Sequence, residues 1–378
     1  MLPAPESTQD FQAAYPDFSE GVAKVSRALE RGDLFLDYLP LRYEVAGSYA
    51  CNLKCVMCVQ SDSCNSEMLS PYSVDGFMEA VKEIGGSNIG ELAIVGGEPF
   101  ANKDSLELID FCSDPMFKNT TITIVTNGLN VDKHLDAIKN IEKLRITLSI
   151  EGTREAYESI RVGSNWNRVT DNYKQLLALE KEKDGLMLEH VMSIIMRSSI
   201  PSLKELVEFF VECRGRLHFV RCCSAFYFEN VFLYPSLLEG INWERHMLDA
   251  IHVAAQYGLD SEINFLTSML RDLKQRASRP NQDVLRQEFD RIVRLCNSDF
   301  EPWQVHGRNK KEKISNEKII ETCENFFAWL KKCNLEIDEN SALYFRQRLQ
   351  ELKERNDSFT KDLGINQSIQ VSLSTRTL

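Results

Sequence analysis

Three cysteines, Cys51, Cys55 and Cys58, lie within the eight-residue segment CNLKCVMC. A loop with this Cys-x3-Cys-x2-Cys spacing can curl around an iron–sulfur cubane and offer one thiolate to each of three irons. Structural clusters and structural zinc sites usually take four protein ligands, so three ligands leave one coordination position open for a substrate or cofactor. Two other interpretations stay open: a zinc site completed by a further ligand such as Cys64, and unligated core thiols.

Glycine and polar residues follow three of the predicted strands. These are Gly96-Gly97-Glu98-Pro99, Thr126-Asn127-Gly128 and Ser149-Ile150-Glu151-Gly152. Paired glycines let a ligand approach the backbone, and Glu98 can accept a hydrogen bond from a cationic group such as an amine. Polar residues at the carboxyl ends of parallel strands form the mouth of an α/β barrel, where the chemistry of that fold takes place.

Strand-like and helical segments alternate between residues 43 and 221. Short β-branched strands are expected at 43–49, 91–95, 121–126, 144–150, 188–195 and 217–221, and helices at 73–84, 103–112, 132–140, 169–181 and 202–213. This alternation favours parallel βαβ units. Six such units predict an α/β fold with a partial or complete barrel, although a doubly wound sheet would give the same alternation.

The motifs CNLKCVMC, GGEP, TNG and SIEG, followed by Ile160-Arg161-Val162-Gly163, occur in this order. In this respect the chain resembles the radical S-adenosylmethionine (SAM) superfamily over about residues 43–221. The resemblance implies a partial (β/α)6 TIM-like barrel with a mainly helical C-terminal extension. It also implies an enzyme that uses a [4Fe–4S] cluster to cleave SAM reductively. The resulting 5′-deoxyadenosyl radical abstracts a hydrogen atom from a small-molecule or peptide substrate.

The same resemblance implies roles for individual residues. Cys51, Cys55 and Cys58 would hold the cluster, and Gly96, Gly97 and Glu98 would bind the methionyl amine of SAM. Ser149 and Arg161 would contact its ribose and carboxylate end, Asn127 would lie nearby, and Met57 would pack near the adenine. The alternative from another class is a non-enzymatic zinc- or iron–sulfur-binding sensor on a degenerate barrel, against which the intact GGEP and SIEG motifs argue.

The C-terminal third only partly follows the pattern of a SPASM/twitch extension. Cys296 and Gly307 resemble its opening, but Glu312 stands where a second cysteine is usual. The region could be a lid without a cluster, a plain helical cap, or the holder of an auxiliary cluster through Cys296, Cys323 and Cys333. The expected organisation is a helical lead-in (1–42), a radical SAM core (43–225), this extension (226–363) and a flexible tail (364–378).

Cys222 and Cys223 follow the sixth predicted strand, and one of them could donate a hydrogen atom to a substrate radical. Such a donor favours redox-neutral epimerisation or rearrangement. An auxiliary cluster favours dehydrogenation or cross-linking, because a second electron must then leave the product radical. Either outcome would suit natural-product or cofactor biosynthesis.

The 378-residue composition is that of an ordinary globular protein, with 44 basic and 56 acidic residues and a net charge of −12. This acidic balance disfavours binding to nucleic acid. No apolar run reaches the length of a membrane span, and the N-terminal segment lacks the pattern of a secretory signal. A cytoplasmic protein is therefore expected, and the resemblance implies a flavodoxin- or ferredoxin-type reductant as its partner.

Overall fold

The computed structural model describes residues 19–33, 40–58, 73–85, 89–223, 226, 228–296 and 316–335, with single residues between 343 and 354. Helix α2 (Ser19–Arg31) lies within the predicted lead-in. The predicted tail of residues 364–378 lies outside the described residues, as do Cys64, Gly307 and Glu312. Among the described residues, none of the helices has both the length and the apolar character that crossing a membrane requires.

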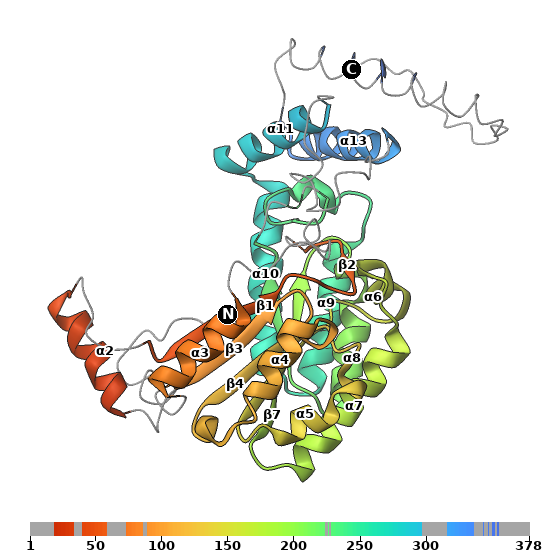
Figure 1. Cartoon of the computed structure of the whole chain (residues 1–378). Coiled ribbons are helices and arrows are strands. Elements are labelled where there is room, and N and C mark those ends of the chain that lie inside the picture. The colour runs from red at the N-terminus through yellow and green to blue at the C-terminus, as the bar shows by residue number, and fades with distance from the viewer. Residues whose placement is uncertain are drawn as a thin grey trace.

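Six parallel strands form one sheet whose spatial order follows the chain (Figure 1). They are β1 (Arg42–Ser48), β3 (Glu91–Gly96), β4 (Thr121–Thr126), β5 (Leu144–Ser149), β7 (Leu186–Ile195) and β8 (Leu217–Arg221). A doubly wound sheet reverses its strand order midway, whereas here each strand pairs with the preceding strand of the sheet. Because β1 and β8 occupy the two edges, the sheet is a partial barrel, and the predicted fold class is confirmed.

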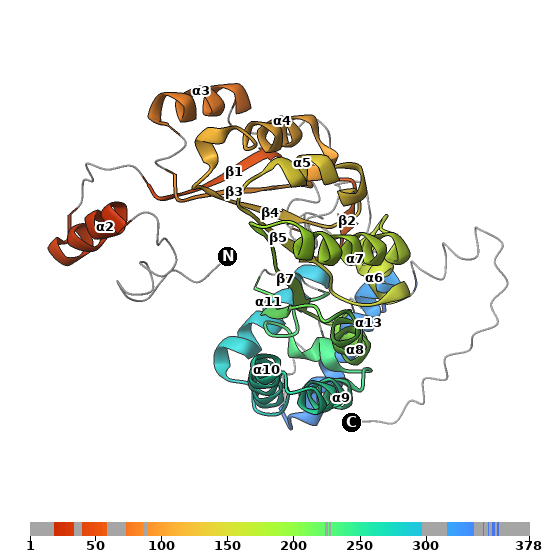
Figure 2. The ribbon, with the colours of Figure 1, turned by 90° about the horizontal axis from the view of Figure 1, so that it is seen from below.

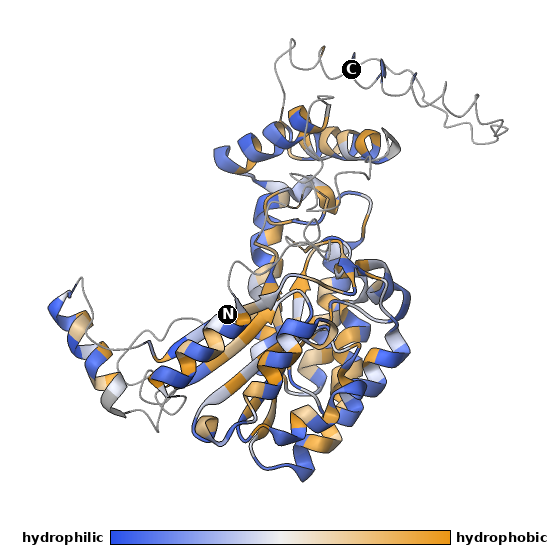
Figure 3. Cartoon of the chain, viewed as in Figure 1, coloured by the Kyte–Doolittle hydropathy of each residue, from blue (hydrophilic) through white to orange (hydrophobic). Residues whose placement is uncertain are grey.

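Helices cover one face of the sheet. They are α3 (Val74–Ile84), α4 (Lys103–Phe111), α5 (Leu135–Asn140), α7 (Trp166–Glu182) and α8 (Leu203–Cys213). Figure 2 shows α3, α4, α5 and α7 side by side along this face. Figure 3 shows hydrophilic residues along the outer faces of these helices, whereas the strands are mainly hydrophobic.

The two faces of the sheet carry different side chains, because successive residues of a strand point to opposite faces. The face that packs against the helices is apolar and buried, with Val45, Ile94, Ile124 and Ile146. On the inner face Thr123 Oγ1 donates to Glu91 Oε1 at 3.1 Å, and Thr147 Oγ1 donates to Glu189 Oε2 at 3.3 Å. The hollow of the partial barrel is therefore polar.

The chain after β8 is mainly helical, as predicted. It forms a short 3-10 helix, η7 (Pro235–Leu238), and helices α9 (Trp243–Gln256), α10 (Asp260–Ser278), α11 (Gln282–Cys296) and α13 (Asn316–Lys332). A fully buried ion pair, Arg291 with Glu288 at 2.7 Å, ties α11 to η7, since Glu288 Oε1 also accepts from the amide of Ser236. Figure 1 shows α11 and α13 beyond the end of the sheet near which the short strand β2 (Lys54–Cys55) lies.

Candidate functional site

The cysteine loop follows β1 and is held by a two-stranded ladder. Its strand β2 pairs antiparallel with β6 (Arg161–Val162), which places Cys55 directly opposite Arg161. Cys55 is buried, whereas Cys51 and Cys58 are partly exposed. The loop that carries the predicted cluster ligands is therefore fixed against a segment about a hundred residues later in the chain.

Two features of the environment of Cys55 act in opposite directions on the ionisation of its thiol. Burial raises the pKa of the Cys55 thiol to about 12, while the charge of Arg161 acts to lower it. Cys51 and Cys58 also act electrostatically on Cys55, so the three thiols lie within reach of one another's charge. Because a thiol must lose its proton to bind a metal, the cationic neighbour favours Cys55 as a ligand. Among the described residues, no group of three or more His, Cys, Asp or Glu side chains has the spacing that would hold a metal ion.

The guanidinium of Arg161 lies between a carboxylate and a thiol. Its Nε and Nη2 atoms donate to the two carboxylate oxygens of Glu151 at 2.5 and 2.6 Å, and Nη1 donates to Cys55 Sγ at 3.6 Å. Arg161 is 7% exposed and Glu151 is 1% exposed. The resemblance assigns Arg161 to the ribose and carboxylate end of SAM, whereas these three contacts direct it to Glu151 and Cys55.

A buried hydroxyl lies beside this group. Tyr157, on helix α6 (Arg154–Ile160), is fully buried, and its hydroxyl lies near the side chain of Ser164. Burial raises the pKa of Tyr157, and the charges of Arg161 and Cys55 also act on it.

The paired glycines allow the start of the cysteine loop to pack against the end of β3. The amide of Gly97 donates to the carbonyl of Ser48 at 2.9 Å, and the amide of Glu98 donates to that of Ala50 at 3.0 Å. A Cβ atom on Gly97 would lie 2.1 Å from the Ala50 oxygen, and Gly96 has a φ of +121°. These two amides are thus used within the protein, so the glycines have a structural function in addition to their predicted contact with SAM.

Glu98 is a fully buried carboxylate with capacity for one further donor. Its Oε1 accepts from Thr126 Oγ1 at 2.6 Å and from the amide of Phe100 at 3.1 Å, and its Oε2 accepts from the amide of Asn127 at 2.7 Å. Burial raises the pKa of Glu98, and these three hydrogen bonds act to lower it. A carboxylate offers about four acceptor positions, so an ammonium group could occupy the fourth.

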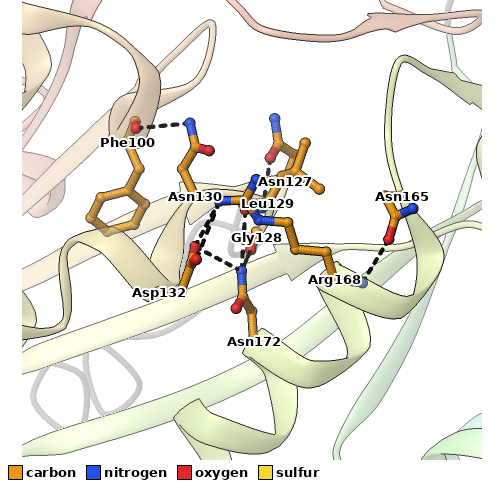
Figure 4. A network of polar contacts seen from close by, with 9 residues as sticks. All are labelled: Phe100, Asn127, Gly128, Leu129, Asn130, Asp132, Asn165, Arg168 and Asn172. Atoms are coloured by element: carbon orange, nitrogen blue, oxygen red, sulfur yellow. Dashed lines mark hydrogen bonds and ion pairs between the residues drawn. The ribbon is translucent and has the colours of Figure 1, made fainter.

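Asn127 joins the TNG loop to the cysteine loop. Its side-chain Nδ2 donates to Asn52 Oδ1 at 2.9 Å, and its Oδ1 accepts from the amide of Leu129 at 3.0 Å. Figure 4 shows that Asn172, on α7, reaches the same loop and donates to the carbonyls of Gly128 and Leu129 at 2.8 and 3.2 Å. The loop that supplies two of the three donors to Glu98 is therefore held from both sides.

The two remaining predicted SAM contacts lie on different parts of the barrel. Ser149 is the last residue of β5, is partly exposed, and is in register with Met192 of β7. Met57 is 8% exposed and belongs to the hydrophobic core. Ser149 is thus at the mouth of the barrel, whereas Met57 is a buried residue of the cysteine loop itself.

The two candidate hydrogen donors differ in exposure. Cys222 is 3% exposed and belongs to the hydrophobic core, and its amide donates to the carbonyl of Ile195 at 3.3 Å. Cys223, the next residue, is exposed. Both follow β8, as predicted, but only Cys223 is accessible in the structure.

Two of the predicted auxiliary ligands, Cys323 and Cys333, lie far apart in the structure. Cys323 is fully buried in α13, and Cys333 directly follows that helix, with its Sγ donating to the carbonyl of Ala277 at 3.1 Å. Ten residues of helix separate two positions by about 15 Å, which is too far for both thiols to ligate one compact cluster. Cys323 and Cys333 are therefore not placed to share a cluster in this structure, and an auxiliary cluster stays a prediction. Cys296 ends α11, and its side chain lies outside the described part of the chain.

The described residues fit the groups that the resemblance implies. Thiols are the ligands that iron–sulfur clusters take, and three of them lie on one fixed loop beside a cation. Glu98 retains acceptor capacity at the neighbouring strand end, and Tyr157 offers a buried hydroxyl. The sequence analysis assigned no individual role to five residues of the site: Asn52, Thr126, Glu151, Tyr157 and Asn172. Three of them, Asn52, Thr126 and Glu151, lie inside the CNLKCVMC, TNG and SIEG motifs, so their place in a motif was the signal that could have pointed to them.

The segment that carries this site matches a known family model. The model of the Radical SAM superfamily matches residues 45–194. A probable GTP 3′,8-cyclase of Methanococcus maripaludis is 31% identical over 116 residues, which cover 30% of this chain and 38% of that relative. A GTP 3′,8-cyclase of Alkaliphilus metalliredigens is 30% identical over 132 residues, covering 34% of this chain and 41% of the relative. The chain thus matches less than half the length of each of these relatives.

Part of the chain also resembles solved structures in its fold. Streptococcus suis SuiB bound to S-adenosylmethionine has a TM-score of 0.41 at 19% identity, with 59% of this chain and 48% of SuiB covered. The protein anSMEcpe with bound AdoMet has a TM-score of 0.43 at 19% identity, with 60% and 63% covered.

Proposed function

Because the chain belongs to the radical SAM superfamily, we propose that it is an enzyme that generates a 5′-deoxyadenosyl radical to remove a hydrogen atom from its substrate. A [4Fe–4S] cluster and SAM are its cofactors. The observation that carries the proposal is the cysteine loop: its central thiol, Cys55, lies beside Arg161, and the loop and the segment before it are joined to the GGE and TNG loops by hydrogen bonds.

Each part of the site has a task in this proposal. Cys51, Cys55 and Cys58 hold the cluster, which, when bound and reduced, supplies the electron that cleaves the C5′–S bond of SAM. Glu98 accepts from the methionyl ammonium group through its remaining acceptor position. Ser149 contacts the ribose and carboxylate end. Asn127 keeps the loop in register with Asn52, and the backbone hydrogen bonds between residues 48–50 and 96–98 hold the start of the cysteine loop against the GGE loop.

The substrate is a small molecule or a peptide, and its polar groups are held in the hollow of the partial barrel. The paired side chains of Thr123 with Glu91 and Thr147 with Glu189 support this proposal, because they place polar atoms on the inner face of the sheet. The similarity to GTP 3′,8-cyclases supports a small-molecule substrate within this choice. A flavodoxin- or ferredoxin-type protein supplies the electron.

A redox-neutral outcome, epimerisation or rearrangement, is favoured over an oxidative one. The separation of Cys323 from Cys333 supports this choice, because it removes one arrangement through which a second cluster could accept an electron. The accessible Cys223 supplies a thiol that could return a hydrogen atom.

The test is anaerobic reconstitution followed by incubation with SAM and dithionite. We expect about four irons per chain and formation of 5′-deoxyadenosine, with both lost in Cys55→Ala. Cys213→Ala, which changes a partly exposed thiol at the end of α8, is the matched control and should retain both. Iron binding without 5′-deoxyadenosine would favour the non-enzymatic sensor, and turnover by Cys55→Ala would contradict the assignment of the thiols.

A further inference from the structure

We propose that Arg161 is a positioning residue that raises the reduction potential of the cluster through Cys55, and that Glu151 limits this effect. The inference rests on the proposed function, since it requires a cluster on the three thiols. It concerns the reduction potential of that cluster, which the sequence motifs do not indicate.

The backbone fixes the relationship between Arg161 and Cys55. The two residues are directly opposite in the β2–β6 ladder. The chain then turns at Gly163, whose φ is +94° and whose added Cβ would lie 3.6 Å from the carbonyl oxygen of Asn52. This turn keeps the segment after β6 against the cysteine loop, so the backbone of Arg161 stays next to that of Cys55.

The side chains fix which part of the guanidinium faces the thiol. Glu151 takes the Nε and Nη2 edge, and this leaves Nη1 directed at Cys55 Sγ at 3.6 Å. The positive group therefore lies between the carboxylate and the sulfur. Cys55 contacts the cation directly, whereas the negative charge of Glu151 acts on it from the far side.

The direction of the effect follows from the charge that reduction adds. A cluster with three thiolate ligands becomes more negative when it takes up one electron, and a buried cation or a hydrogen bond to a ligand sulfur stabilises the reduced form. Arg161 should therefore raise the potential. Removing the carboxylate of Glu151 should raise it further, and removing the guanidinium should lower it.

The experiment is a potentiometric titration of the reconstituted cluster with dithionite as electron donor, followed by electron paramagnetic resonance in the absence of SAM. Three proteins are compared: the wild type, Glu151→Gln, and the double variant Arg161→Gln/Glu151→Gln, which leaves no unpaired buried charge. We expect a higher midpoint potential in Glu151→Gln. In the double variant we expect a potential lower by a tenfold change in the equilibrium constant, which is about 59 mV for one electron.

The control is a second arginine–glutamate pair away from the cysteine loop. Arg216 and Glu180 form an ion pair between the segment before β8 and helix α7, and Arg216→Gln/Glu180→Gln should leave the potential unchanged. Equal potentials in all proteins would overturn the inference. So would a double variant that only weakens SAM binding in equilibrium dialysis.

Failure of the inference is distinguishable from failure of the proposed function. A wild type that forms 5′-deoxyadenosine but shows unchanged potentials in the variants contradicts the inference alone. A wild type that assembles no cluster contradicts both. If the double variant does not load iron, Glu151→Gln still decides, because the inference requires its potential to rise.

Discussion

The side-chain amide of Asn127 donates a 2.9 Å hydrogen bond to the side-chain oxygen of Asn52, 75 residues earlier in the chain. Asn52 lies between Cys51 and Leu53 in the cysteine loop, and Asn127 supplies its own backbone amide to Glu98. This single contact therefore connects the predicted cluster ligands to the predicted amine-binding carboxylate.

Loss of this contact should weaken SAM binding. In Asn52→Ala the buried amide of Asn127 loses its acceptor, at a cost of about 1–3 kcal/mol. If this cost falls on the SAM-bound arrangement, the Kd for SAM rises by about 5- to 150-fold. Equilibrium dialysis with the reconstituted protein measures the change. Asn281→Ala, which removes an asparagine oxygen that accepts from the amide of Val284 at the remote helix α11, should leave the Kd unchanged.

Gly97→Ala should disrupt the cysteine loop. The new Cβ would lie 2.1 Å from the Ala50 oxygen, so the backbone has to move, at a cost of about 1–3 kcal/mol or more. We expect a lower midpoint of thermal unfolding and less iron per chain after reconstitution. Gly76→Ala is the control: its Cβ would meet Ser73 at an ordinary 3.6 Å within α3, and it should stabilise the protein by about 0.5–1 kcal/mol. Normal iron loading in Gly97→Ala would contradict the close packing of this loop.

The accessible thiol of Cys223 should matter for the product and not for SAM cleavage. If it returns a hydrogen atom, Cys223→Ala forms 5′-deoxyadenosine at the wild-type rate but gives a different product, or a product without solvent deuterium. Mass spectrometry of reactions in deuterated water measures this. Cys222→Ala should act only through packing, because that side chain is buried. An unchanged product in Cys223→Ala would remove the donor role.

The thiols of Cys323 and Cys333 should not contribute to iron binding. Cys323 packs in the interior of α13, and Cys333 donates to the carbonyl of Ala277, which also accepts from Trp329 Nε1 at 3.0 Å. We therefore expect Cys323→Ala and Cys333→Ala to bind the same amount of iron and sulfide as the wild type. A loss of about four irons per chain in either variant would show that a second cluster is present.

Local sequence signals were sufficient for the sheet. The β-branched run at Thr121–Thr126 predicted its strand with the observed bounds, because it is continuous and is followed by the turn residues Asn127 and Gly128. The strand at Leu217–Arg221 was also predicted with its observed bounds. The helix α11 was missed, since its charged residues hide a narrow apolar stripe. The two-residue strands β2 and β6 have no local signal, because their pairing depends on a contact between distant segments.

For the site, as for the sheet, local signals predicted the residues that lie in motifs but not the contacts between distant segments. Cys55, Glu98 and Asn127 lie in short motifs whose residue types indicate their chemistry. The ion pair of Arg161 with Glu151 and the hydrogen bond of Asn127 to Asn52 were not predictable, because each depends on the register in which separate loops meet. Tyr157 carries no motif at all, and only its burial beside Arg161 draws attention to it.

The stability that the contacts of Asp132 with Arg168 and Asn172 give to the segment after the TNG loop should depend on pH. Burial alone would raise the pKa of Asp132, but hydrogen bonds from Arg168 and Asn172, and the charge of Arg168, lower it below its ordinary value of 3.8 (Figure 4). A carboxyl group with a lowered folded-state pKa stabilises the fold above its unfolded pKa. This contribution is lost as the pH falls below 3.8 toward the folded value.

Asp132→Asn should therefore be less stable than the wild type at pH 7, by up to about 1 kcal/mol for so exposed a pair, and this difference should shrink as the pH falls below 3.8. Urea unfolding of the apoproteins at several pH values measures the difference. Arg168→Gln should show the same pH dependence, because it removes the partner that Asp132 binds at 3.1 Å. A destabilisation of equal size at pH 7 and pH 3 would mean that the ionised carboxylate does not hold the loop.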